Sequence, residues 1–132
     1  VVIHFYPNSA DFRKKIIRKV DGREVEEPYD PRADMVLEEV ATLAQQFGNA
    51  RIVIEGHTDG SMKGKVPASL GKELSQLRAG AVKDELIAKF KFDPNRFAVD
   101  GLGWDRPSDP DQPDEHVLNR RVEIKVYSAE KE

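Results

Sequence analysis

A short apolar stretch that ends in a polar tip constrains the fold of this chain more than any other feature. Residues 52–54 are a β-branched run that ends at Gly56, so the sequence predicts a strand over residues 51–56. The polar residues 57–59 follow at once, where the chain must leave the sheet. Ligand-binding side chains are often found at such strand ends, so this tip is the first candidate for a functional site.

A helix is predicted downstream, over about residues 69–90. Its apolar residues lie four, three and four apart, the spacing of one buried helix face. They are Leu70, Leu74, Leu77 and Ala81. Arg78 borders this face, and Ser75 is expected to be a small packing residue that lets the helix approach the sheet. An acid at the strand end, Asp59, and an arginine on the next helix can face one pocket. Such a pair suits a zwitterionic ligand, because a carboxylate binds its ammonium group and a guanidinium binds its carboxylate.

The composition is that of a well-solvated globular domain. The 132 residues fit one domain with a real core, since 39% are hydrophobic and 34% are charged. The formal net charge of -3 argues against general nucleic-acid binding. The chain has no cysteine, which excludes disulfides and thiolate metal sites, and no apolar run approaches the roughly 20 residues that span a bilayer. Because it starts inside a strand pattern without a signal peptide, we expect a domain excised from a longer protein.

The remaining core elements follow from local patterns. Further strands are predicted over residues 1–6, 96–100 and 121–127. The first of these is mostly apolar and is expected to lie inside the sheet. A helix is predicted to open with Asp30 as its cap and Pro31 at its first position. Its expected buried stripe is Val36, Val40, Leu43 and Phe47. Residues 128–132 are expected to be a frayed tail.

Residues 13–27 form an unusual segment between the first strand and the first helix. Asp21-Gly22 is a strong signal for a two-residue hairpin turn, and basic residues precede it while acidic residues follow it. Pairing across such a hairpin matches opposite charges. We therefore predict an inserted arm, which is either a solvated hairpin without a partner or a surface that docks a neighbouring envelope protein.

Four sequence blocks, in order, carry a resemblance to a known family. They are Ile54-Glu55-Gly56-His57-Thr58-Asp59, Leu74-Ser75-Gln76-Leu77-Arg78-Ala79, Gly101-Leu102-Gly103-Trp104-Asp105-Arg106-Pro107 and Asn119-Arg120-Arg121-Val122-Glu123-Ile124. Spread over nearly the whole chain, these blocks resemble the OmpA-like peptidoglycan-binding domain, which includes the C-terminal domains of OmpA, Pal and MotB. The resemblance implies an α/β fold of the α+β kind, a two-layer sandwich with helices on one face of a mixed β-sheet. Residues 1–132 are then one domain of order β-α-β-α-β-β, with an inserted β-hairpin after the first strand.

The same resemblance implies a binding site for a cell-wall peptide. Asp59 matches the family's aspartate that engages the ammonium of diaminopimelate, and Arg78 matches the arginine that takes its carboxylate. Asn8 falls where a ligand-contacting asparagine often lies, and a plain turn residue explains it equally well. The expected ligand-binding residues are Asp59, Arg78, Thr58, Asn8, Leu74, Asn119 and Arg121. Gly71 departs from the family, which commonly has an asparagine there, so a contact carried by that side chain is missing.

We therefore predict a periplasmic domain that anchors an envelope protein to the cell wall by binding diaminopimelate-type stem peptides non-covalently. No catalytic residue, metal, cofactor or nucleic-acid partner is expected. Two other hypotheses stay open. One is a metal-dependent cell-wall hydrolase built on His57 and Asp59 with His4 or His116, against which a packing role for His57 is favoured because the sequence fixes no third ligand. The other is a protein–protein docking module that uses the 13–27 arm.

Overall fold

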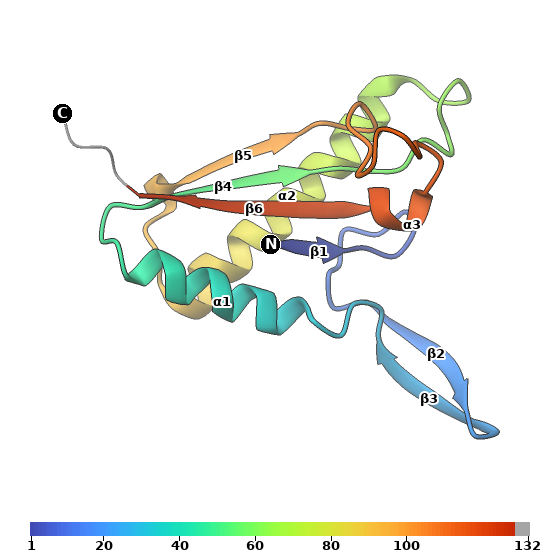
Figure 1. Cartoon of the computed structure of the whole chain (residues 1–132), viewed down its shortest axis with the longest axis horizontal. Coiled ribbons are helices and arrows are strands. Elements are labelled where there is room, and N and C mark those ends of the chain that lie inside the picture. Colours follow the sequence, from blue (N-terminus) through green and yellow to red (C-terminus); the bar gives the residue numbers. More distant parts are fainter. Residues whose placement is uncertain (129–132) are drawn as a thin grey trace.

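A four-stranded mixed sheet forms one layer of the fold, and the helices α1 and α2 form the other (Figure 1). The computed structural model describes residues 1–128. Its strands are β1 (Val2–His4), β2 (Lys15–Val20), β3 (Arg23–Pro28), β4 (Arg51–Gly56), β5 (Phe97–Gly101) and β6 (Arg121–Tyr127). Its helices are α1 (Ala33–Gln45), α2 (Ala68–Phe90) and α3 (His116–Asn119), with a 3₁₀ turn at Pro94–Arg96. The predicted two-layer sandwich is confirmed, and α3 is an addition. The expectation of a frayed tail concerns residues 128–132, of which 129–132 lie outside the described part.

The strand order β1-β6-β4-β5 places β4 and β6 in the middle of the sheet. β4 runs parallel to β5 and antiparallel to β6, and β6 also pairs antiparallel with β1. The expectation that the first strand is central is therefore wrong, because only one side of β1 is paired. Its apolar character comes from Ile3, which is fully buried under the helices, and not from burial on both faces.

The core lies between the sheet and the two long helices. α2 packs against β4 and β5, while α1 packs against β1 and β6. The strands contribute Ile3, Ile52, Ile54, Val122 and Ile124, and Phe5 follows directly after β1. The helices contribute Ala33, Val36, Leu37, Val40, Ala41, Ala44, Ala79, Val82 and Leu86. Within residues 1–128, no helix has the length and apolar character needed to cross a membrane.

The predicted buried stripe is wrong in part on both long helices. On α1, Leu43 is 41% exposed, and Phe47, beyond the helix end, is 48% exposed. On α2, Leu70 and Leu77 are exposed, and the buried residues are Gly71, Ser75, Arg78, Ala79, Val82 and Leu86. The reason lies at Gly56, where an added Cβ would be only 1.8 Å from the Ser75 carbonyl oxygen. The two backbones touch there, so α2 turns Gly71, Ser75 and Ala79 inward, and Leu70 and Leu77 point outward.

Asp30 does not cap α1, contrary to the prediction. The residue at the cap position is Arg32, and it makes no side-chain cap. Asp30 instead accepts hydrogen bonds from two backbone N–H groups, that of His4 on β1 at 2.8 Å and that of Arg32 at 2.9 Å. It therefore ties the edge strand to the entrance of the helix.

The hairpin β2–β3 projects away from the rest of the domain (Figure 1). Asp21 and Gly22 both have positive φ, 52° and 78°, as the predicted two-residue turn requires. The expected charge matching is present, since the Arg18 guanidinium lies 2.9 Å from the Glu27 carboxylate. Arg13 does not belong to this arm, because its Nη2 donates to Asp34 at 2.7 Å and to Glu85 at 2.8 Å. It bridges the two long helices instead.

Candidate functional site

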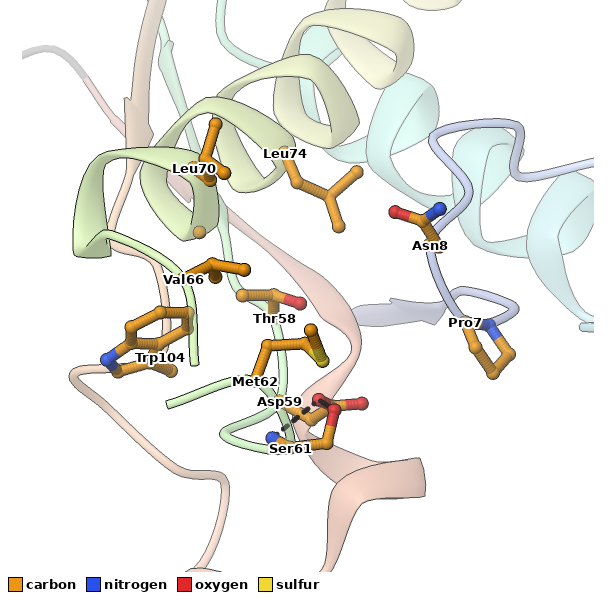
Figure 2. A pocket seen from close by; sticks show the side chains of 11 residues that line it. Pro7, Asn8, Thr58, Asp59, Ser61, Met62, Val66, Leu70, Leu74 and Trp104 are labelled. Carbon is orange, nitrogen blue, oxygen red and sulfur yellow. Dashed lines mark hydrogen bonds between the residues drawn. The ribbon is translucent and has the colours of Figure 1, made fainter. Parts of the chain in front are cut away.

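A cavity of about 440 Å³ opens where the polar tip after β4 meets the start of α2. Its size falls in the range of small-ligand pockets. Its lining is Pro7, Asn8, Thr58, Asp59, Ser61, Met62, Val66, Leu70, Gly71, Leu74 and Trp104. Figure 2 shows Asp59 and Ser61 at one end, the α2 leucines at the other, and Trp104 and Asn8 on opposite sides. Four of the seven predicted site residues therefore line one cavity: Asn8, Thr58, Asp59 and Leu74.

Asp59 is the ionised group of this pocket. Its Oδ1 accepts hydrogen bonds from the backbone N–H of Ser61 at 3.0 Å and from the Ser61 hydroxyl at 2.6 Å. Its Oδ2 accepts from Arg120 Nη1 at 3.0 Å. Burial alone would raise the pKa of Asp59, but the bonds from Ser61 and Arg120 outweigh it and lower that pKa below its ordinary value. Asp59 is therefore a carboxylate at neutral pH.

Arg120 is the partner of Asp59 that the sequence did not single out. The residue is 8% exposed and donates through Nε to the Phe5 carbonyl at 3.1 Å and through Nη2 to the Tyr29 hydroxyl at 3.2 Å. These contacts fix the guanidinium behind Asp59. The pair Arg120-Arg121 was visible in the sequence, but which arginine reaches Asp59 depends on how the chain leaves α3 and enters β6.

Arg78 lies behind the pocket wall and is fully buried, with 0% of its surface exposed. Its guanidinium donates to three backbone carbonyls: those of Ser9 at 2.8 Å, His57 at 3.0 Å and Tyr6 at 3.2 Å. Burial lowers the pKa of Arg78 to about 10, so it stays charged at neutral pH. It thereby joins the loop that carries Asn8 to the strand end that carries Asp59. A guanidinium has five N–H donors, so two of them have no partner among the described residues.

The structure places Asn119 and Arg121 away from the pocket lining. Asn119 is 2% exposed, and it accepts from the Ser108 N–H at 2.8 Å and donates to the Pro113 carbonyl at 2.9 Å. It therefore holds the proline-rich loop. Arg121 lies on the sheet face opposite the helices, where Nε donates to Glu123 at 2.6 Å and Nη2 to the Arg106 carbonyl at 3.1 Å. A ligand contact by either residue stays a prediction.

Gly71 and Trp104 form one wall of the pocket together. A Cβ on Gly71 would lie 2.7 Å from the indole Cε3, so the absence of a side chain at residue 71 leaves room for the ring. Ser75, one turn later, is buried and accepts a hydrogen bond from the Gly103 N–H at 2.9 Å, as befits the packing role expected of it. Glycine at position 71, where the family commonly has asparagine, therefore gives the Trp104 ring the space that it occupies.

His57 does not line the pocket, although it precedes Thr58 in the chain. It is 1% exposed, and burial, followed by the charge of Arg121, lowers its pKa to about 4. Among residues 1–128, the cluster of three potential metal ligands that includes His57 contains Glu55 and Glu123 and not Asp59, His4 or His116. The donor set of the hydrolase hypothesis is therefore not assembled in this fold.

The fold and the pocket define a class of protein: an α/β domain that offers one carboxylate inside a largely apolar cavity, as a binding module does. The OmpA family model matches residues 4–121, and the chain belongs to the OmpA family. It is an OmpA-like domain, and the domains of this family are non-catalytic modules.

Comparisons with individual proteins agree with this assignment. The chain is 32% identical to outer membrane protein Omp38 of Acinetobacter baumannii over 99 residues, which are 74% of this chain and 26% of Omp38. The C-terminal domain of MotB from Helicobacter pylori matches with a TM-score of 0.58 at 26% identity, over 73% of this chain and 74% of that one. The peptidoglycan-associated lipoprotein from Burkholderia pseudomallei matches with a TM-score of 0.67 over 95% of this chain and 88% of that one. At 19% identity, this last likeness shows the fold alone.

Proposed function

We propose that this domain anchors a larger envelope protein to the cell wall in the periplasm by gripping diaminopimelate-type stem peptides non-covalently. The chain spans only 26% of Omp38, so the anchored protein and its membrane attachment are part of this proposal. The similar proteins support the setting, since they include an outer membrane protein, a peptidoglycan-associated lipoprotein and a periplasmic domain of MotB.

The observation that carries the proposal is the Asp59 carboxylate inside a largely apolar pocket. A carboxylate has about four lone-pair sites, and Ser61 and Arg120 use three of them. The remaining site suits the ammonium group at the end of a diaminopimelate side chain. The apolar walls, including Leu74 and Met62, then pack on the methylene groups that lead to it.

Arg78 is the proposed partner for the ligand carboxylate. Its guanidinium donates to the carbonyls of Ser9 and His57, the chain neighbours of the pocket residues Asn8 and Thr58, and so lies behind the pocket wall. Two of its N–H groups have no partner within residues 1–128, and a carboxylate takes two parallel N–H donors well. Because Arg78 has no exposed surface, this contact requires Leu74 or the Asn8 loop to shift when the ligand enters.

Co-sedimentation with purified sacculi, followed by calorimetric titration with stem peptides, tests the proposal. Asp59→Asn is expected to weaken binding by about 2–5 kcal/mol, because it removes one partner of a partly buried charge contact. Asp84→Asn, an exposed carboxylate elsewhere on α2, is the matched control and should bind like the wild type. Circular dichroism must confirm the fold, since Asp59→Asn also deprives Arg120 of its carboxylate partner. Unchanged sedimentation by folded Asp59→Asn protein would remove the site assignment.

A second titration separates the two ends of the ligand. A lysine-type stem peptide carries the side-chain ammonium but lacks the additional carboxylate of diaminopimelate. If Arg78 takes that carboxylate, the lysine peptide should bind the wild type at least tenfold more weakly. Equal affinities for both peptides would leave the Asp59 contact standing and contradict the role of Arg78.

We also propose that the β2–β3 arm docks a neighbouring envelope protein. The arm exposes apolar side chains, with Ile17 at 66% and Val20 at 48%, although a free two-stranded hairpin is only marginally stable in water. Replacing residues 15–28 by a short Gly/Ser linker, with Arg13 kept, should preserve sacculus binding and abolish cross-linking to the partner in cells. Unchanged cross-linking would show that the arm is a solvated hairpin.

A further inference from the structure

The sheet face that points away from the helices carries an acidic pair at its centre. Glu55 on β4 and Glu123 on β6 are directly opposite one another in the register of the two strands. His57 follows Glu55 by two residues, so it projects from the same face. One potential ligand atom from each of these three side chains lies within 4.8 Å of the others.

The buried imidazole of His57 has no hydrogen-bond partner among the described residues. The residue is 1% exposed, and this holds for both Nδ1 and Nε2. Buried polar atoms in folded proteins nearly always have a partner, and a neutral imidazole needs an acceptor for one nitrogen and a donor or a metal for the other. His57 does not line the peptide pocket, so a ligand in that pocket would not satisfy its ring nitrogens. The unpaired imidazole therefore points to a second ligand at this cluster.

The two carboxylates are only half satisfied by the protein. Like charges opposite one another on neighbouring strands are unfavourable. Lys125 lies 3.2 Å from Glu55 Oε1, and Arg121 Nε lies 2.6 Å from Glu123 Oε2, so each contact engages one oxygen. Arg121 is further held by backbone carbonyls, whereas the Lys125 side chain is 45% exposed and is free to swing into solvent.

We propose that Glu55, His57 and Glu123 bind a divalent cation of the zinc class and thereby clamp β4 to β6. One imidazole nitrogen and two carboxylate oxygens are ligands that Zn²⁺ accepts at about 2.0–2.2 Å. Tetrahedral geometry at such lengths separates ligand atoms by roughly 3.3 Å, so rotations of the three side chains close the site from its present spacing. Imidazole favours zinc over the hard cations Mg²⁺ and Ca²⁺.

This site is separate from the peptide pocket, because none of its three residues lines that pocket. Its role is structural. The cation would give the His57 imidazole a partner and cancel the repulsion between the carboxylates. It would also hold the end of β4, from which Thr58 and Asp59 continue into the pocket.

Calorimetric titration of tag-free full chain with ZnCl₂ tests the proposal. The wild type should bind one Zn²⁺ per chain, and Glu55→Gln and Glu123→Gln should each weaken binding by at least about tenfold. Glu38→Gln on α1 and His4→Gln are the matched controls for adventitious carboxylate and imidazole binding, and both should bind as the wild type does. Mg²⁺ and Ca²⁺ should bind far more weakly.

Lys125→Met gives a test that loss of folding cannot imitate. It removes the cation that competes for Glu55, so zinc binding should become several-fold tighter. The thermal midpoint of the wild type should also rise on adding zinc, as binding to the folded state requires. Three results would each overturn the site. The wild type could release no heat of binding when zinc is added, or His4→Gln could lose zinc binding while Glu55→Gln keeps it. Unchanged zinc affinity in all the cluster variants would be the third.

Discussion

Gly56→Ala tests whether backbone contact between β4 and α2 sets the geometry of this domain. A Cβ on Gly56 would lie 1.8 Å from the carbonyl oxygen of Ser75 and 2.7 Å from its carbonyl carbon. A relaxed contact between carbon and oxygen is about 3.3 Å long, so α2 must move away from β4 by roughly 1.5 Å. No side-chain rotation relieves the clash, because a Cβ is fixed by its own backbone and the atoms it meets are also backbone.

That movement breaks contacts that the structure identifies. It pulls Arg78 Nη1 away from the His57 carbonyl, now at 3.0 Å, and Ser75 Oγ away from the Gly103 N–H, now at 2.9 Å. Overpacking of a core costs about 1–3 kcal/mol and each lost hydrogen bond about 1 kcal/mol. We therefore expect the free energy of unfolding to fall by about 3 kcal/mol or more.

Urea unfolding followed by the fluorescence of Trp104, the single tryptophan, measures this loss. Gly80→Ala is the matched control on the same helix, because a Cβ there meets nothing within 4 Å. That variant should gain up to about 1 kcal/mol from helix propensity. If Gly56→Ala loses less than about 1 kcal/mol, the close approach of α2 to β4 is not a requirement of the fold, and our account of the buried helix face fails.

Three further predictions concern single residues. Arg78→Met should lower the free energy of unfolding by about 3 kcal/mol or more, because it leaves three buried carbonyls unpaired; a loss below about 1 kcal/mol in urea would contradict this. Gly71→Asn should displace the Trp104 indole and weaken peptide binding, which fluorescence and calorimetry detect; tighter binding would refute it. The hydrogen bond from Arg13 lowers the pKa of Glu85 below 4.5, so this stabilisation is present above pH 4.5 and is lost as the pH falls. Arg13→Ala should therefore lose thermal stability at pH 7 but not at pH 2, and equal losses at both would rule out the ion pair.

Local patterns in the sequence were enough to find most elements. The strands at 51–56 and 121–127 were predicted with their observed bounds, and the second helix begins one residue earlier than expected. The Asp21-Gly22 turn was also found, because its positive φ angles are a local property of these two residues. Short-range signals of this kind depend on steric limits and side-chain spacing within a few residues.

The site was only partly predictable. Asn8, Thr58, Asp59 and Leu74 line the pocket as a group, since a strand end and the following helix start meet at one edge of the sheet. The arginine beside Asp59 is Arg120 and not its neighbour in the chain. Adjacent residues where a strand begins project in opposite directions, so Arg120 reaches Asp59 while Arg121 contacts Glu123 on the far face of the sheet.

The sequence by itself determines the order of the elements, the polar tip at Asp59 and the family of the protein. Each of these depends on short stretches of neighbouring residues, which can be recognised without the structure. Tertiary packing alone determines which side of α2 is buried, because that depends on the contact between Gly56 and the distant Ser75 backbone. The register of β4 against β6 likewise brings Glu55 opposite Glu123. Such pairings join residues that are far apart along the chain, and no local spacing encodes the distance between them.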